Sequence, residues 1–249
     1  GERAERGLLV TADRGNAIVM TWMGNTFFFD ATNPEAQAFV WEQCKKNYYQ
    51  YGIRCFWLDE AEPEYGNYDF DNYRYYAGPA LQCSNVYPVG YAKGFYEGLK
   101  EAGEENVMSL IRCAWAGSQK YAVLTWSGDI SSTFRAMREQ LQAGLSMGMA
   151  GIPWWTSDIG GFLGGQVDDP AFRELLVRWF QWACFCPVFR MHGERSPWYE
   201  REQEYIGDVR QLTSGQANEV WSFGDEVYEI LRKYLFVRER MRPYIREVM

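Results

Sequence analysis

Two short apolar runs in this chain each end close to an aspartate. Phe56-Trp57-Leu58 is followed by Asp59, and Leu124-Thr125-Trp126 is followed by Ser127-Gly128-Asp129. An apolar run of strand length that stops at an acid places a carboxylate at the end of a buried strand. Two such carboxylates can flank one bond, as glycoside cleavage requires: one attacks the anomeric carbon, and the other, kept protonated, donates to the departing oxygen. A single strand-end aspartate more often caps the next helix, so the pair with adjoining tryptophans is what favours catalysis.

The composition is that of a globular protein of one or two domains. The 249 residues, of which 47% are apolar and 17% aromatic, can bury a sizeable core. The 33 acidic and 25 basic residues give a net charge of −8 and there is no basic tract, so we expect no nucleic-acid partner. The aromatic residues exceed what a core of this size needs, and flat amphipathic rings suit stacking on sugars, although most of them are expected in the core.

The sequence offers few ligands for a metal or cofactor, and we expect neither. The six cysteines lack zinc spacing and are interpreted as reduced, and His192 is the only histidine. The acidic run that begins at Asp59 could instead ligate a hard cation, but it lacks the glycine turn of a calcium loop.

No signal peptide or membrane-spanning run is recognisable, so we expect no membrane partner. The chain does not begin with methionine, and its true start is expected upstream. We leave localisation open, with a slight preference for the cytoplasm, and we leave the oligomeric state open as well.

Strand and helix signals alternate along the chain. β-Type runs separated by turn signals predict hairpins over residues 8–11, 17–22 and 26–29. Further strands are predicted over residues 53–58, 107–112, 122–126, 149–154 and 185–190. Helices are predicted over residues 34–52, 88–102, 132–147 and 170–183, and a long helix after the polar loop 193–217. Asn33 and Asp169 are predicted to cap the helices that begin at Pro34 and Pro170, and Gly52 is predicted to stop the first of these.

Apolar strands that alternate with helices predict an α/β fold with a parallel sheet covered on both faces. Residues whose side chains could act in catalysis or binding follow strand after strand, which favours a (β/α)8 TIM-barrel type over a doubly wound sheet. Because only five such strands are countable and a closed barrel needs eight, we predict a partial barrel: the last five β/α units, with the first strands missing. Residues 1–33 would form a β-hairpin insertion near the active site, and residues 34–249 the partial catalytic barrel.

The predicted strand ends place Asp59, Arg112, Asp129, Asp158 and His192 on one face of the fold. Arg112 either neutralises neighbouring carboxylates or binds sugar hydroxyls, and both roles are compatible. Asp158 precedes Ile159-Gly160-Gly161-Phe162, where glycines allow close approach to a ligand, or it caps a turn. His192, with Arg190 and Arg195 beside it, is either structural or a hydroxyl donor.

At these positions the chain resembles glycoside hydrolase family 31, the retaining α-glycosidases that include α-glucosidases and α-xylosidases. The resemblance covers Trp22-Met23-Gly24 with Asp30-Ala31-Thr32-Asn33-Pro34, Trp57-Leu58-Asp59-Glu60-Ala61-Glu62, Arg112, Trp126-Ser127-Gly128-Asp129, Gly151-Ile152-Pro153, Ser157-Asp158-Ile159-Gly160-Gly161-Phe162 and Cys186-Pro187-Val188-Phe189-Arg190-Met191-His192-Gly193.

The resemblance implies Asp59 as nucleophile and Asp129 as general acid/base. It also implies that sugar hydroxyls are bound by Arg112, Asp158 and His192, between walls shaped by Trp22, Trp126 and Phe162. The family's first barrel strands, its N-terminal β-sandwich, its C-terminal β domains and a substrate-binding aspartate from the first strand have no counterpart here. The tyrosine-rich segment after Asp59 matches no general family pattern and is predicted to bear on substrate choice.

The leading hypothesis is a retaining α-glycosidase of carbohydrate metabolism, which hydrolyses O-glycosyl bonds of an oligosaccharide or α-glycoside through a covalent glycosyl-enzyme. The alternative is a non-catalytic carbohydrate-binding or scaffold remnant of such a barrel. A metal-dependent hydrolase that uses the acidic run is a third hypothesis. We expect the 249 residues by themselves to be inactive, because part of the pocket wall is missing and strands 53–58 and 185–190 would be open edges.

Overall fold

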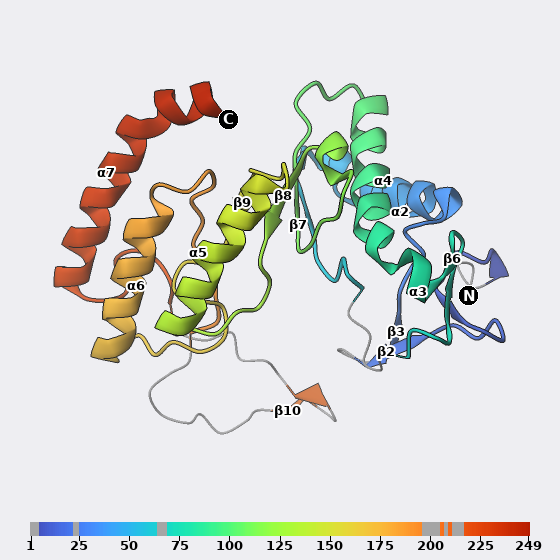
Figure 1. Ribbon diagram of the computed structural model, residues 1–249, viewed down its shortest axis with the longest axis horizontal. Helices are drawn as coiled ribbons and strands as arrows, with labels where there is room; N and C mark the ends of the chain where they lie inside the picture. Colours follow the sequence, from blue (N-terminus) through green and yellow to red (C-terminus); the bar gives the residue numbers. More distant parts are fainter. Residues whose placement is uncertain (1–4, 22–24, 64–68, 196–204, 207–208, 211–216) are drawn as a thin grey trace. The chain divides into compact units, whose positions relative to one another are not determined.

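The computed structural model describes residues 5–21, 25–63, 69–195, 205–206, 209–210 and 217–249 (Figure 1). The chain divides into two compact units, Gly1–Thr125 and Trp126–Met249.

The first unit opens with short antiparallel strands, as the turn signals predict. β2 (Val19–Thr21) and β3 (Asn25–Phe27) form a hairpin, and an isolated bridge joins Leu9 to Phe29. β1 (Thr11–Ala12) pairs with β5 (Tyr73–Tyr75), which pairs in turn with β6 (Gly78–Pro79). The pairing of β1 with β5 was not predicted, because it joins segments about sixty residues apart in the chain. Tyr73 and Tyr75 are buried in the core of this layer, so their rings serve packing.

Helix α2 (Pro34–Asn47) begins at the predicted cap: the Asn33 side chain accepts a hydrogen bond from the amide of Glu35. The short helix η1 (Tyr49–Tyr51) follows and ends at Gly52, which has a left-handed conformation. α3 (Ala80–Cys83) and η2 (Ser84–Val86) lead into α4 (Tyr87–Glu101), which lies against α2 (Figure 1). The two helices touch at Gly98, where an added Cβ would lie 2.4 Å from the ring of Trp41.

Three parallel strands form the central sheet of the first unit. β4 (Phe56–Leu58) pairs with β7 (Ser109–Ile111), and β7 pairs with β8 (Val123–Trp126), all in parallel. Parallel neighbours need a crossover, which α4 supplies between β4 and β7, whereas only η3 (Ser118–Tyr121) lies between β7 and β8. The buried core of this sheet joins residues from the strands, from the two helices and from the loop after β4: Trp41, Leu58, Ala61, Ala92, Phe95, Leu99, Ile111 and Val123.

The second unit starts at Trp126, the last residue of β8, and contains the short strand β9 (Trp155–Thr156). Between them lies α5 (Phe134–Met149), which is capped by Thr133. α6 (Pro170–Ala183) begins at the predicted cap Asp169 and packs beside α7 (Asp225–Val248) (Figure 1). A short antiparallel pair, β10 (Tyr205–Ile206) and β11 (Val209–Arg210), lies in the segment predicted as a polar loop.

Two predicted strands are wrong. Residues 149–154 are not a strand, because α5 runs on to Met149 and the chain turns through Gly151 before β9 begins at Trp155. Residues 185–190 form no strand either. The amides of Phe185 and Cys186 still bond to carbonyls of the last turn of α6, and Pro187 offers no amide for a sheet. The edge expected at residues 185–190 is therefore absent, whereas β4 has no partner on its other side among the described strands.

Candidate active site

Asp59 directly follows β4, at the carboxyl end of the parallel sheet, as predicted. Its carboxylate is half exposed and accepts a hydrogen bond from the amide of Glu60 at 2.9 Å. Nη1 of Arg112 lies 3.3 Å from Oδ1 of Asp59, so the structure brings these two predicted site residues together.

Arg112 faces three carboxylates at once. Its Nη2 lies 3.2 Å from Oε2 of Glu60, and its Nε lies 2.7 Å from Oε1 of Glu62. The backbone amide of Arg112 donates to the carbonyl of Leu58 at 3.2 Å, which extends the β4–β7 ladder and sets Arg112 beside Asp59. Burial by itself would lower the pKa of the Arg112 guanidinium, but the hydrogen bond and charge of Glu62, with the charges of Asp59 and Glu60, outweigh it and raise that pKa. The arginine therefore stays charged and orients Asp59.

The second unit holds Asp129, Asp158 and His192. Asp129 follows β8 after Gly128, which has a left-handed φ of 76°, and its side chain is exposed. Asp158 is fully buried and forms an ion pair with Nη1 of Arg190. The preceding residue, Ser157, is held in place, because the indole nitrogen of Trp179 donates to its hydroxyl at 3.0 Å.

The pKa of the Asp158 carboxyl group lies above its ordinary value. Burial raises the pKa of Asp158 to about 6, the charge and hydrogen bond of Arg190 oppose the rise, and the negative charge of Asp129 adds to it. Within the described part of the chain, Oδ2 of Asp158 has no hydrogen-bond partner. A buried carboxylate oxygen without a protein partner is a natural acceptor for a ligand hydroxyl.

Aromatic rings stand beside these polar groups. The guanidinium of Arg190 lies 5.8 Å from the ring centre of the buried Trp126, and the ring of Phe162 stacks on that of His192 with centroids 5.4 Å apart. The structure thus brings together Trp126 with Asp158, through Arg190, and Phe162 with His192. Trp22 lies outside the described residues.

Sequence reasoning missed Arg190 as a site residue, although it noted that residue beside His192. It also interpreted Glu60 and Glu62 as possible cation ligands, whereas both pair with Arg112.

Among the residues that the structure describes, no group of His, Cys, Asp and Glu side chains has the arrangement of a metal site. All six cysteines are free thiols. In the described regions no helix is both long and apolar enough to span a bilayer.

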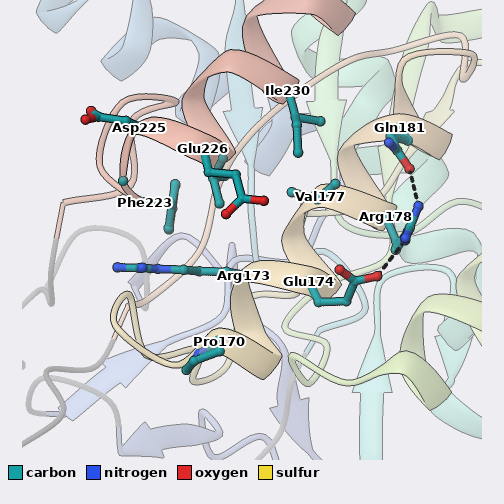
Figure 2. Close-up of a pocket in the computed structure, with 12 residues that line it drawn as sticks. Pro170, Arg173, Glu174, Val177, Arg178, Gln181, Phe223, Asp225, Glu226 and Ile230 are labelled. Atoms are coloured by element: carbon teal, nitrogen blue, oxygen red, sulfur yellow. Dashed lines mark hydrogen bonds and ion pairs between the residues drawn. The ribbon is translucent and has the colours of Figure 1, made fainter.

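A pocket of about 500 Å³ lies elsewhere in the second unit, between α6 and α7 (Figure 2). Its charged lining is largely paired: Arg178 donates to Glu174 at 2.7 Å and to Gln181 at 3.3 Å, and Arg173 pairs with Asp168. None of the predicted site residues lines this pocket.

A comparison with protein families shows which family this chain belongs to. Residues 2–248 match the model described as the glycosyl hydrolases family 31 TIM-barrel domain. The chain belongs to glycosyl hydrolase family 31. Family membership confirms the predicted resemblance, and together with the parallel strands β4, β7 and β8 it confirms an α/β fold that is part of a TIM-barrel domain. The count of five strands is not confirmed, because residues 185–190 are not a strand.

Relatives within family 31 include glucosidases and xylosidases by name. The chain is 64% identical over 192 residues to the uncharacterized family 31 glucosidase ORF2 of Pseudescherichia vulneris, a match that covers 77% of this chain and 36% of that protein. It is 34% identical over 228 residues to an α-xylosidase of Saccharolobus solfataricus, with 88% of this chain and 28% of that protein covered.

A solved structure named as a family 31 enzyme matches the chain closely. An α-xylosidase from a soil metagenome, complexed with xylose, matches with a TM-score of 0.94 and 59% identity, over 99% of this chain and 36% of that one. The present chain thus spans between 28% and 36% of the length of these three relatives.

Proposed function

We propose that the full-length protein that contains this chain is a retaining α-glycoside hydrolase of the α-xylosidase or α-glucosidase type. The observation that carries the proposal is the carboxylate of Asp59, held by Arg112 at the carboxyl end of β4 in a chain of family 31. A nucleophilic carboxylate must be aimed at the anomeric carbon, and the contact with the buried guanidinium of Arg112 fixes its direction.

In the proposed reaction the Asp59 carboxylate attacks the anomeric carbon while the bond to the leaving oxygen breaks. Asp129 donates its proton to that oxygen. Asp129 then takes a proton from water, the water oxygen attacks the anomeric carbon, and Asp59 is released as a carboxylate. Two inversions at one carbon leave the anomeric configuration retained.

Arg112, Asp158 and His192 are proposed to bind hydroxyls of the sugar, with Trp126, Phe162 and Trp22 as walls. The buried free oxygen of Asp158 and the stacking of Phe162 on His192 support this assignment in the second unit. That the residues of the two units face one substrate stays a prediction. The division into a hairpin insertion, residues 1–33, and a partial barrel, residues 34–249, is likewise part of the proposal.

α-Xylosides are the first substrates to test. The solved structure with 59% identity is named an α-xylosidase and is complexed with xylose, and the Saccharolobus solfataricus relative is named an α-xylosidase. The relative that is 64% identical is named a glucosidase without being characterised, so α-glucosides are the natural comparison.

The experiment assays the purified full-length protein with aryl α-xyloside and aryl α-glucoside and follows the product by proton NMR from the first turnover. We expect the α-anomer of the free sugar to appear before mutarotation. A β-anomeric first product would overturn the retaining mechanism, and no turnover of any α-glycoside would favour the carbohydrate-binding alternative.

A further inference from the structure

Arg195 is a fully buried cation that is held by neutral groups. Its guanidinium donates to the backbone carbonyls of Ile159 at 3.0 Å, Gly161 at 2.9 Å and Glu194 at 3.1 Å. A longer bond of 3.3 Å reaches the carbonyl of Gly164, and Nε donates to the side chain of Asn218 at 2.9 Å.

Stability alone explains such an arginine poorly. In the described regions Arg195 forms no ion pair with a carboxylate, and burial lowers its pKa to about 10, although the charge of Asp158 opposes this. Burial of a charge without an ion-pair partner costs free energy, which hydrogen bonds to neutral groups offset only in part. The groups that the guanidinium holds point to a role other than stability.

Three of the bonded carbonyls belong to one loop, residues 158–165. Four glycines of this loop, at positions 160, 161, 164 and 165, have left-handed φ values between 80° and 88°. Residues 158–165 belong to no helix or named strand, so the path of this loop depends on the donors that meet its carbonyls. Arg195 supplies those donors from a single planar group.

The same loop carries Asp158 and Phe162 and is bonded to the segment that carries Asp129. The amides of Phe162 and Leu163 donate to the carbonyl of Ile130 at 2.8 and 2.9 Å, and the amide of Ser132 donates to the carbonyl of Leu163 at 3.1 Å. The contact is tight, because a Cβ added at Gly161 would lie 2.6 Å from the Cα of Ser132.

The segment that carries His192 also contacts this loop. The amide of Glu194 donates to the carbonyl of Phe162 at 2.9 Å, and the rings of Phe162 and His192 stack. Arg195 therefore lies at the point where the segments bearing Asp158, Phe162 and His192 are joined.

We propose that Arg195 is a positioning residue of the sugar site, which fixes Asp158 and Phe162 relative to Asp129 through the backbone of residues 158–165. The inference rests on the proposed glycosidase function. Arg195 itself contacts no substrate in this proposal, and its effect passes through the loop.

The test compares Arg195→Lys with Arg238→Lys in the full-length protein. Arg238 is a matched control, because it also donates to three backbone carbonyls, those of Cys184, Cys186 and Pro187, but these lie just after α6. With an aryl α-xyloside we expect Arg195→Lys to raise KM and to lower kcat/KM by about 10- to 100-fold, since a misplacement of about 1 Å costs up to about 100-fold. Arg238→Lys should leave KM unchanged. Loss of folded enzyme lowers only the apparent kcat, so KM separates positioning from stability.

Hydrogen exchange measured by mass spectrometry on the same proteins gives a second readout. Amides of residues 159–165 and 130–132 should exchange faster in Arg195→Lys and not in Arg238→Lys. If Arg195→Lys does not fold, Asn218→Ala removes only the bond to Nε and should shift KM and exchange in the same direction, by less.

An unchanged KM in the folded variant, or unchanged exchange in the loop, overturns the positioning role. A wild-type protein without any glycosidase activity overturns the proposed function and the positioning role together, and faster exchange in Arg195→Lys would then mark the arginine as purely structural.

Discussion

The guanidinium of Arg112 lies 3.3 Å from the carboxylate of Asp59, and its two other nitrogens face Glu60 and Glu62. Each nitrogen of the fork thus has a carboxylate partner within the protein. These contacts are those of the electrostatic role of Arg112, in which it holds Asp59 in place and balances part of a dense negative charge. Its second role, the binding of sugar hydroxyls, stays a proposal.

Asp59→Ala in the full-length protein should lower turnover of α-glycosides by several powers of ten, because the covalent step loses its nucleophile. Azide should restore part of the activity and yield a glycosyl azide of inverted configuration, which NMR identifies. Asp71→Ala removes an exposed aspartate of the same unit and serves as the control. Near-normal turnover in Asp59→Ala would refute the assignment.

Asp129→Ala should produce a different pattern, because a proton donor matters less when the leaving group is already good. We expect the variant to retain far more of the first step on activated aryl glycosides than on natural oligosaccharides. The measurement is kcat/KM for a series of aryl leaving groups, in which the variant should depend more steeply on leaving-group pKa than the wild type. An equal loss across the series would point to a structural role.

Asp158→Asn should change the pH dependence of stability. Burial raises the pKa of Asp158 from 3.8 to about 6, so between these pH values the folded protein retains a proton that the unfolded chain has lost. The free energy of unfolding contributed by this group therefore falls as the pH rises from about 4 to 6, by about 3 kcal/mol in total, and is constant above.

Denaturant unfolding of the full-length protein from pH 4 to 7 measures this effect. The wild type should lose stability relative to Asp158→Asn across that window, and Asp168→Asn, an exposed aspartate nearby in sequence, should follow the wild type. Parallel pH profiles for wild type and Asp158→Asn would contradict the raised pKa.

Gly161→Ala and Gly164→Ala form a matched pair within one loop. Both glycines have left-handed φ values, 82° and 80°, so each alanine costs about 1 kcal/mol of backbone strain. At Gly164 the new Cβ meets nothing within 4 Å, whereas at Gly161 it meets the backbone of Ser132 at 2.6 Å. We expect Gly161→Ala to be clearly less stable than Gly164→Ala in thermal unfolding and to lose activity. Equal melting temperatures for the two variants would contradict this, because they would show that the backbone near Ser132 moves to make room for the added Cβ.

Helix caps, helix ends and short strands were predicted well where they depend on residues close together in the sequence. Asn33 and Asp169 cap the helices that were expected to begin there, and Gly52 ends its segment in a left-handed conformation. The apolar runs that end before Asp59 and at Trp126 are parallel strands. The predictions failed at residues 149–154 and 185–190, where apolar runs of strand length end a helix or pack irregularly. Hydrophobicity does not distinguish these outcomes.

The sequence by itself determined the family, the α/β class and the strand-end position of Asp59, because these depend on residue types and short spacings. Only the tertiary structure decided which charges meet. Arg190 pairs with Asp158 across 32 residues, and Arg112 meets three carboxylates that follow a different strand. Arg195 similarly donates hydrogen bonds to the carbonyls of Gly161 and Ile159, which precede it by more than thirty residues. Such pairings are set by how strands and loops pack, since buried charges and carbonyls must find partners wherever the fold brings them.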